Sequence, residues 1–136
     1  IMTRKSTFDT ISIKVYYEDT DAGGIVYHSK YLNYAERGRT ELLRTKSLQQ
    51  NKLFIENGIR FVVRNLTISY IKTAFLDDLL LLQTKIKLLS KAKVIFDQNI
   101  YKENILICNL EAMVCCLNKK GKVVRIPNDL YYKLLN

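Results

Sequence analysis

The sequence is poor in the residues that build metal sites and disulfide frameworks. Its 136 residues hold one histidine, His28, and three cysteines, Cys108, Cys115 and Cys116. An odd number of cysteines without a CxxC spacing argues against a disulfide framework, and a single histidine leaves too few ligands for a zinc site. We therefore expect buried free thiols, no metal and no resident cofactor.

Long apolar runs, linkers and targeting features are also missing. The longest strongly apolar run, residues 79–82, is far shorter than the about 20 residues that cross a bilayer. Residues 1–6 are followed by no apolar stretch of signal-peptide length, and Pro127 is the only proline. We expect no transmembrane segment, a cytoplasmic location and one domain spanning residues 1–136.

Acidic residues are few compared with basic ones. The 22 Lys and Arg against 13 Asp and Glu give a formal net charge of +9. This charge suits nucleic acid, an anionic membrane surface or a small molecule that carries several phosphates. The densest basic cluster, residues 119–122, is typical of a solvated hairpin turn, and no recognised nucleic-acid motif is present. We therefore predict no nucleic-acid partner, and charge alone decides nothing further.

Hydrophobic periodicity predicts an α+β fold. Residues 8–17 alternate as a strand does, and Ser29 is placed to cap a helix that runs to about residue 46. Gly38 lies in the apolar stripe of that helix, which indicates close packing on something flat, such as a sheet. A short helix or loop is expected over residues 48–57, and a terminal helix over 128–135. Later strands are expected over residues 60–72 (one strand, or two joined by a bulge), 79–89, 93–101, 105–117 and 123–126. This order favours a helix packed on one face of an antiparallel sheet, with an exposed face or edge that oligomerisation can cover.

The segment between the first strand and the helix, residues 18–28, gathers three acids, two glycines and the only histidine. It is not a calcium loop, because Lys30 stands where a bidentate glutamate is required. The glycine patterns of phosphate-binding loops and the GxSxG elbow of serine hydrolases are absent. The segment can support acyl transfer, because the first turn of a helix offers free N–H groups and partial positive charge to a carbonyl oxygen.

In that chemistry Asp21 is the candidate nucleophile or general base, and the backbone N–H near His28 is the candidate oxyanion donor. Gly23 and Gly24 let the backbone approach a substrate closely, and Tyr17 can hydrogen-bond within the site. A carboxylate mechanism needs a reactive ester, and a thioester is one. A plainer alternative stays open: an Asx turn and cap made by the acids, a surface histidine, and tyrosines that only fill the core and its rim.

Several motifs resemble those of the hotdog-fold acyl-CoA thioesterases. The similarity is greatest to the bacterial branch that is related to 4-hydroxybenzoyl-CoA thioesterase and associated with the Tol-Pal system. The motifs cover nearly the whole chain in the family's order: residues 16–28, 31–32, 36–41, 61–64, 76–78 and 125–127. The resemblance implies one long helix wrapped by a curved antiparallel sheet of five to six strands. It also implies protomers that pair edge to edge into dimers, often assembled further into tetramers.

The resemblance implies hydrolysis of acyl-CoA to a free acid and CoA. Asp21 matches the catalytic carboxylate, and His28 matches the helix-start position whose N–H faces the thioester oxygen. Tyr17 matches a tyrosine implicated in the site. Gly23, Gly24 and Tyr27 fall in the motif expected to bind substrate.

The CoA phosphates lie on basic surface in this family, and Arg64, Lys72 and Lys91 are the residues we assign to them. The acyl pocket is expected to be shared between protomers, and acyl carrier protein is a further expected partner. The chain departs from the family at Gly38, where relatives often carry alanine, and at Lys72-Thr73, where they often carry a proline. The alternative function is a non-catalytic module that binds acyl-CoA or acyl carrier protein in an envelope complex.

Overall fold

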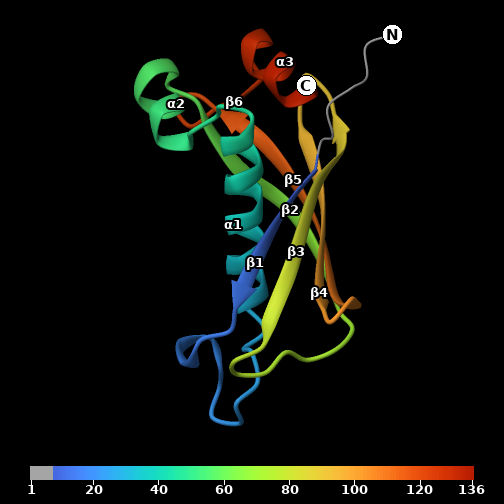
Figure 1. Cartoon of the computed structure of the whole chain (residues 1–136). Helices are drawn as coiled ribbons and strands as arrows, with labels where there is room; N and C mark the ends of the chain where they lie inside the picture. Colours follow the sequence, from blue (N-terminus) through green and yellow to red (C-terminus); the bar gives the residue numbers. More distant parts are fainter. Residues whose placement is uncertain (1–7) are drawn as a thin grey trace, which may run out of the picture.

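The protein is a long helix packed on a twisted antiparallel sheet (Figure 1). The computed structural model describes residues 8–136, so the expectation for the N-terminal residues 1–6 lies outside the described residues. The strands are β1 (Phe8–Lys14), β2 (Arg60–Tyr70), β3 (Leu79–Leu89), β4 (Val94–Lys102), β5 (Ile105–Leu117) and β6 (Val123–Val124). The helices are α1 (Lys30–Thr45), α2 (Gln50–Asn57) and α3 (Asn128–Leu135), with a short 3₁₀ turn η1 at Tyr17–Asp19. The α+β arrangement expected from the sequence is confirmed.

The strands lie in the order β1-β3-β4-β5-β2, and β6 pairs with β5. All of the pairs are antiparallel. β1 and β2 therefore form the two edges of the main sheet. A bulge in β2 between Val63 and Asn65 confirms the irregular strand expected there.

The packing of α1 on the sheet depends on Gly38. A Cβ atom at this position would lie 2.5 Å from Thr84 Oγ1 and 2.6 Å from Leu82 Cδ2. Gln98 on β4 donates hydrogen bonds to the backbone carbonyl of Ala35 (2.7 Å) and to Thr84 Oγ1 (2.9 Å). The helix thus touches the sheet closely, as its glycine predicted, and a buried polar group fixes where along the sheet it lies.

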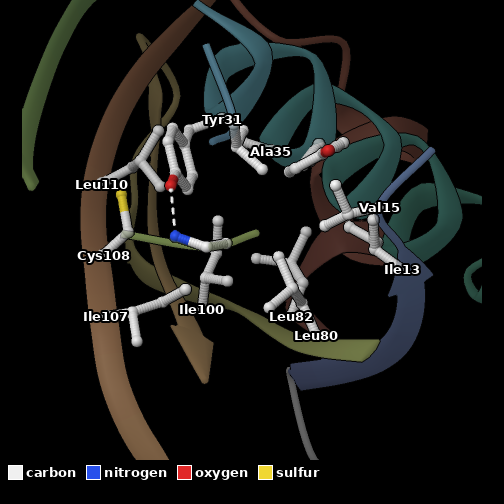
Figure 2. Packing of buried hydrophobic residues seen from close by; sticks show 13 residues of the cluster. Ile13, Val15, Tyr31, Ala35, Leu80, Leu82, Ile100, Ile107, Cys108 and Leu110 are labelled. Carbon is white, nitrogen blue, oxygen red and sulfur yellow. Dashed lines mark hydrogen bonds between the residues drawn. The ribbon is translucent and has the colours of Figure 1, made fainter. Parts of the chain in front are cut away.

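Two apolar clusters form the core. The cluster near the start of α1 is shown in Figure 2, where Tyr31 and Ala35 from the helix face Leu82, Ile100 and Leu110 from the sheet. The second cluster lies near the other end of α1 and includes residues of α2 and α3. All three cysteines are buried and unpaired, as expected.

The structure corrects the end of the first strand and one detail of the helix start. The first strand ends at Lys14 instead of residue 17, because the Asp19 carboxylate accepts a hydrogen bond from the Tyr16 N–H (3.0 Å) and folds the chain into η1. Ser29 stands at the start of α1 but makes no capping hydrogen bond through its side chain. The ambiguous segment 48–57 contains the helix α2, which Gly58 ends with a φ of 67°.

Candidate active site

The turn between β1 and α1 is held against the segment that joins β2 to β3. The Val26 N–H donates to the Ala74 carbonyl (2.9 Å), and the Leu76 N–H donates to the Gly24 carbonyl (3.1 Å). Ile25 and Phe75 form an antiparallel bridge between the same two segments. Backbone hydrogen bonds therefore hold residues 18–28 against a segment about 50 positions further along the chain.

Asp21 lies exposed at the tip of this turn. Its Oδ1 atom accepts hydrogen bonds from the N–H groups of Gly23 (2.8 Å) and Ile25 (3.4 Å), which is the geometry of an Asx turn. Its Oδ2 atom has no hydrogen-bond partner in the described part of the chain. The Asx turn proposed as the plainer alternative is thus present, and it orients the carboxylate with one oxygen left free.

The two neighbouring glycines have different geometry. A Cβ atom on Gly23 would lie 3.3 Å from Asp21 Oδ1, which is tighter than ordinary contact. Gly24 has a φ of 80°, in the left-handed region that side chains disfavour. Both positions therefore favour glycine for the backbone path around Asp21.

Asp19, in contrast, is a structural acid. It is buried, its side chain bonds the Tyr16 N–H, and its carbonyl accepts the Tyr27 N–H (3.0 Å). Burial and the neighbouring Asp19 carboxylate raise the pKa of the Tyr34 hydroxyl. Asp19 is committed to shaping the turn. Of the two exposed acids, Glu18 and Asp21, only Asp21 lines the cavity beside the start of α1.

The start of α1 offers free backbone donors beside this turn. The Lys30 N–H bonds the Tyr27 carbonyl (2.9 Å) and the Leu32 N–H bonds the Ser29 carbonyl (3.1 Å). The N–H groups of His28 and Ser29 donate to no acceptor within residues 8–136. With the partial positive charge at the start of a 16-residue helix, they make a suitable place for a carbonyl oxygen that gains negative charge.

Asp21 and His28 open into one cavity of about 330 Å³. The cavity also brings together Tyr27 and Lys72, two of the residues predicted to bind substrate. Its complete lining is Asp21, Ile25, Val26, Tyr27, His28, Tyr31, Tyr70, Ile71, Lys72 and Thr73. One carboxylate, one lysine and His28, whose N–H is free, stand beside apolar and aromatic side chains in this cavity, which is suited to an acyl compound that carries an anionic group.

Tyrosines from two elements form a wall of this cavity. The Tyr31 hydroxyl accepts a hydrogen bond from the Ala74 N–H (3.2 Å), drawn in Figure 2. The Tyr70 hydroxyl donates to the His28 carbonyl (3.0 Å). The rings of Tyr31 and Tyr70 pack edge to face, with their centroids 5.5 Å apart. Burial raises the pKa of both Tyr31 and Tyr70, so both hydroxyls keep their protons at neutral pH.

Five predicted site residues are not among those that line the cavity: Gly23 and Gly24 in the Asp21 turn, and Tyr17, Arg64 and Lys91 further away. Tyr17 belongs to η1 and is 82% exposed. Arg64 is exposed at the bulge of β2. Lys91, in the turn between β3 and β4, donates to Asn128 Oδ1 (2.6 Å) at the end of the sheet opposite the Asp21 turn (Figure 1). Of the three predicted phosphate-binding residues, Lys72 alone is among the described residues that line the cavity.

Sequence reasoning missed Tyr70, Ile71 and Thr73, which line the cavity from the end of β2. It also missed a second cavity of about 170 Å³ between α1 and β2. That cavity contains the buried guanidinium of Arg39, which bonds Gln98 Oε1 (2.9 Å). No sequence signal could have found these residues, because they reach the sites through pairings between distant parts of the chain.

Metal and membrane features are absent from the described residues. Among residues 8–136, no group of three or more His, Cys, Asp or Glu side chains could hold a metal ion. None of the described helices has the length and apolar composition needed to span a bilayer.

Comparison with known proteins defines the class of protein. Residues 15–134 match the family model of the thioesterase-like superfamily, and the chain belongs to this superfamily. The solved structure of 4-hydroxybenzoyl CoA thioesterase from Pseudomonas sp. strain CBS-3 has a TM-score of 0.87 at 19% identity, over 95% of this chain and 99% of that one. The fold is therefore the hotdog fold expected from the resemblance.

Two curated relatives are more similar in sequence. The acyl-CoA thioester hydrolase YbgC of Escherichia coli is 44% identical over 120 residues, covering 87% of this chain and 89% of the relative. The acyl-CoA thioesterase YbgC of Haemophilus influenzae is 40% identical over 119 residues, covering 87% and 88% of the two chains. With these relatives and this fold, the chain is a thioester hydrolase.

Proposed function

We propose that the chain hydrolyses acyl-CoA to a free carboxylic acid and CoA at the Asp21 cavity. One observation carries the proposal: Asp21, with a free carboxylate oxygen, and His28, with a free N–H at the start of α1, line the same cavity. The two YbgC relatives, whose names describe acyl-CoA thioesterases, support CoA as the carrier of the acyl group.

In the proposed mechanism the thioester carbonyl oxygen accepts a hydrogen bond from the free N–H of His28. Asp21 Oδ2 then follows one of two routes. It attacks the carbonyl carbon and expels CoA thiolate, leaving an anhydride that water cleaves, or it takes a proton from the water that attacks. Both routes consume one water, and the departing thiolate takes up a proton.

Other residues have supporting roles in the proposal. Gly23 and Gly24 keep the backbone close to the reacting carbonyl, and Tyr27 forms part of the substrate wall. Lys72 at the cavity pairs with a CoA phosphate. The roles assigned to Tyr17, Arg64 and Lys91 stay predictions from the resemblance.

We also propose that the active form is a homodimer paired through β2. One edge of β2 has no partner strand among residues 8–136, and an open edge of 11 residues is suited to pairing with a second copy. In an antiparallel pair, the first half of one β2 lies beside the second half of the other. Residues 61–63 line the cavity of Arg39, and residues 70–73 line the cavity of Asp21. Pairing of this kind would bring the Arg39 cavity of one protomer next to the Asp21 cavity of its partner.

The test of hydrolysis is thiol release from a panel of acyl-CoAs, short to long and aromatic. Asp21→Asn is expected to lower kcat by about 100-fold or more, because the variant loses the nucleophile or base. Asp129→Asn makes the same change on the exposed first turn of α3 and is expected to leave kcat unchanged. A near-normal rate in Asp21→Asn, with the circular dichroism of the wild type, would remove Asp21 from the mechanism.

Two further results would refine or replace the proposal. A single turnover in ¹⁸O-labelled water gives an unlabelled first product only if Asp21 is the nucleophile. Binding of acyl-CoA without thiol release from any member of the panel would favour the non-catalytic module. The tetramer, the acyl carrier protein partner, the Tol-Pal association and the cytoplasmic location stay predictions.

A further inference from the structure

The hydrogen bond between Tyr70 and His28 joins the end of an edge strand to the start of α1. Tyr70 is the last residue of β2, and its hydroxyl lies 3.0 Å from the His28 carbonyl oxygen. No other group in residues 8–136 donates to this oxygen. The residue therefore contacts the backbone of the proposed oxyanion site while its ring lines the same cavity.

The bond replaces one that a regular helix would make. In an α-helix the His28 carbonyl would accept the N–H four residues later, which belongs to Leu32. Here the Leu32 N–H bonds the Ser29 carbonyl instead (3.1 Å), and the preceding turn is also tight, from the Lys30 N–H to the Tyr27 carbonyl (2.9 Å). The tight turns leave the His28 carbonyl outside the helix, where the Tyr70 hydroxyl binds it.

Fixing this carbonyl also fixes a donor. The His28 C=O and the Ser29 N–H belong to one planar peptide unit, so holding one end sets the direction of the other. Without the hydroxyl, the Leu32 N–H is free to bond the His28 carbonyl and to extend the regular helix by one residue. That change would turn the peptide plane and move the start of α1, where the His28 N–H lies at the cavity.

We propose that Tyr70 is a positioning residue for thioester hydrolysis, because its hydroxyl holds the His28–Ser29 peptide and so keeps the start of α1 in the position where the His28 N–H faces the acyl carbonyl. The inference rests on the proposed function, since it gives a role to a residue of that same site. Tyr70 does not touch the reacting atoms in this role. It acts through the backbone that does.

The ring of Tyr70 is held independently of its hydroxyl. It packs edge to face on Tyr31, with ring centroids 5.5 Å apart. The following N–H groups, of Ile71 and Lys72, both donate to the Ile107 carbonyl (2.9 and 3.0 Å). Tyr70→Phe therefore removes the hydrogen bond and leaves the packing in place, which makes it a clean probe.

The kinetic test compares Tyr70→Phe with Tyr132→Phe, the same change on α3, where the tyrosine is 58% exposed. For Tyr70→Phe we expect kcat to fall by about tenfold and KM to change by less than about twofold. The reason is that the variant weakens the backbone hydrogen bond to the carbonyl oxygen in the transition state and leaves substrate binding intact. The control is expected to match the wild type. A raised KM with unchanged kcat would overturn the proposal, because Tyr70 would then only bind substrate.

A second readout does not depend on activity. The amide resonances of His28 and Ser29 in ¹⁵N spectra are expected to shift in Tyr70→Phe and to stay in place in Tyr132→Phe. Unshifted amides, or shifted amides with an unchanged kcat, would each contradict the positioning role. Failure of the proposed function would give a different result: Asp21→Asn would release thiol as fast as the wild type.

Discussion

At the scale of single residues, Asp21 shows why the turn motif has two interpretations. One carboxylate oxygen closes an Asx turn through Gly23 and Ile25, and the other is free at the cavity. The structural and the catalytic interpretation therefore describe the same geometry, and neither excludes the other. What separates them is the surroundings of the free oxygen, which the spacing of residues along the chain does not reveal.

The buried thiols lead to a prediction about alkaline stability. Burial raises the pKa of Cys108 from an ordinary 9.0 to about 12. Between these values the unfolded chain loses a proton that the folded chain keeps, so the free energy of unfolding falls as the pH rises. We expect Cys108→Ala to flatten this decline by up to about 1.4 kcal/mol per pH unit, measured by urea unfolding between about pH 8 and 10.5.

Val114→Ala serves as the control, because it removes buried volume from the same strand without removing a thiol. Its stability is expected to be lower at every pH, with the slope of the wild type. Equal slopes for wild type and Cys108→Ala would show that this thiol does not contribute to the alkaline decline.

At the scale of secondary-structure elements, local patterns predicted most of the fold. β3, β4 and β5 lie within about one residue of their expected bounds, because alternating burial is a property of neighbouring residues. The end of β1 was wrong, because a side chain-to-backbone bond at Asp19 overrides the alternation. The contacts of segment 71–78 with the Asp21 turn could not be predicted, since they join residues about 50 positions apart. The same limit hid Tyr70, whose partner His28 lies 42 residues away.

Segment 71–78 depends on an ion pair with the hairpin between β4 and β5. Lys102 lies 2.9 Å from Asp78 Oδ2, and the two side chains are only 30% and 16% exposed. Asp78 Oδ2 also accepts the Phe75 N–H (2.8 Å), so loss of the lysine leaves a partly buried carboxylate without its counter-charge. We expect Lys102→Met to lower the free energy of unfolding by about 1–2 kcal/mol and to speed hydrogen exchange in the segment.

Lys87→Met is the matched variant, because its ion pair with Glu111 lies on a more exposed part of the sheet, at 56% and 38% exposure. Its expected cost is below about 0.5 kcal/mol, since solvent screens the pair. Similar costs for the two variants would mean that the Lys102 pair has no special part in holding the segment.

At the scale of the whole molecule, the two cavities occupy different halves of β2. The Asp21 cavity contains the proposed reacting groups, and polar side chains make up most of its lining. The Arg39 cavity has apolar walls and a polar rim, in which Gln50 donates to Thr40 and Thr40 donates to Glu36. Pairing of β2 with its copy would combine them into one site, with chemistry from one protomer and acyl specificity from the other.

This composite site predicts complementation between two damaged chains. Asp21→Asn removes the carboxylate, and Thr40→Tyr places a ring at the rim of the Arg39 cavity, so each homodimer is expected to be nearly inactive. In a hybrid dimer made from both variants, one site collects both changes and the other site has neither. Random mixing after joint refolding makes half of the dimers hybrids, so about a quarter of the wild-type rate should return. If each site lay within one chain, every site in the hybrid would carry one change and no rate would return, and the composite site would be excluded.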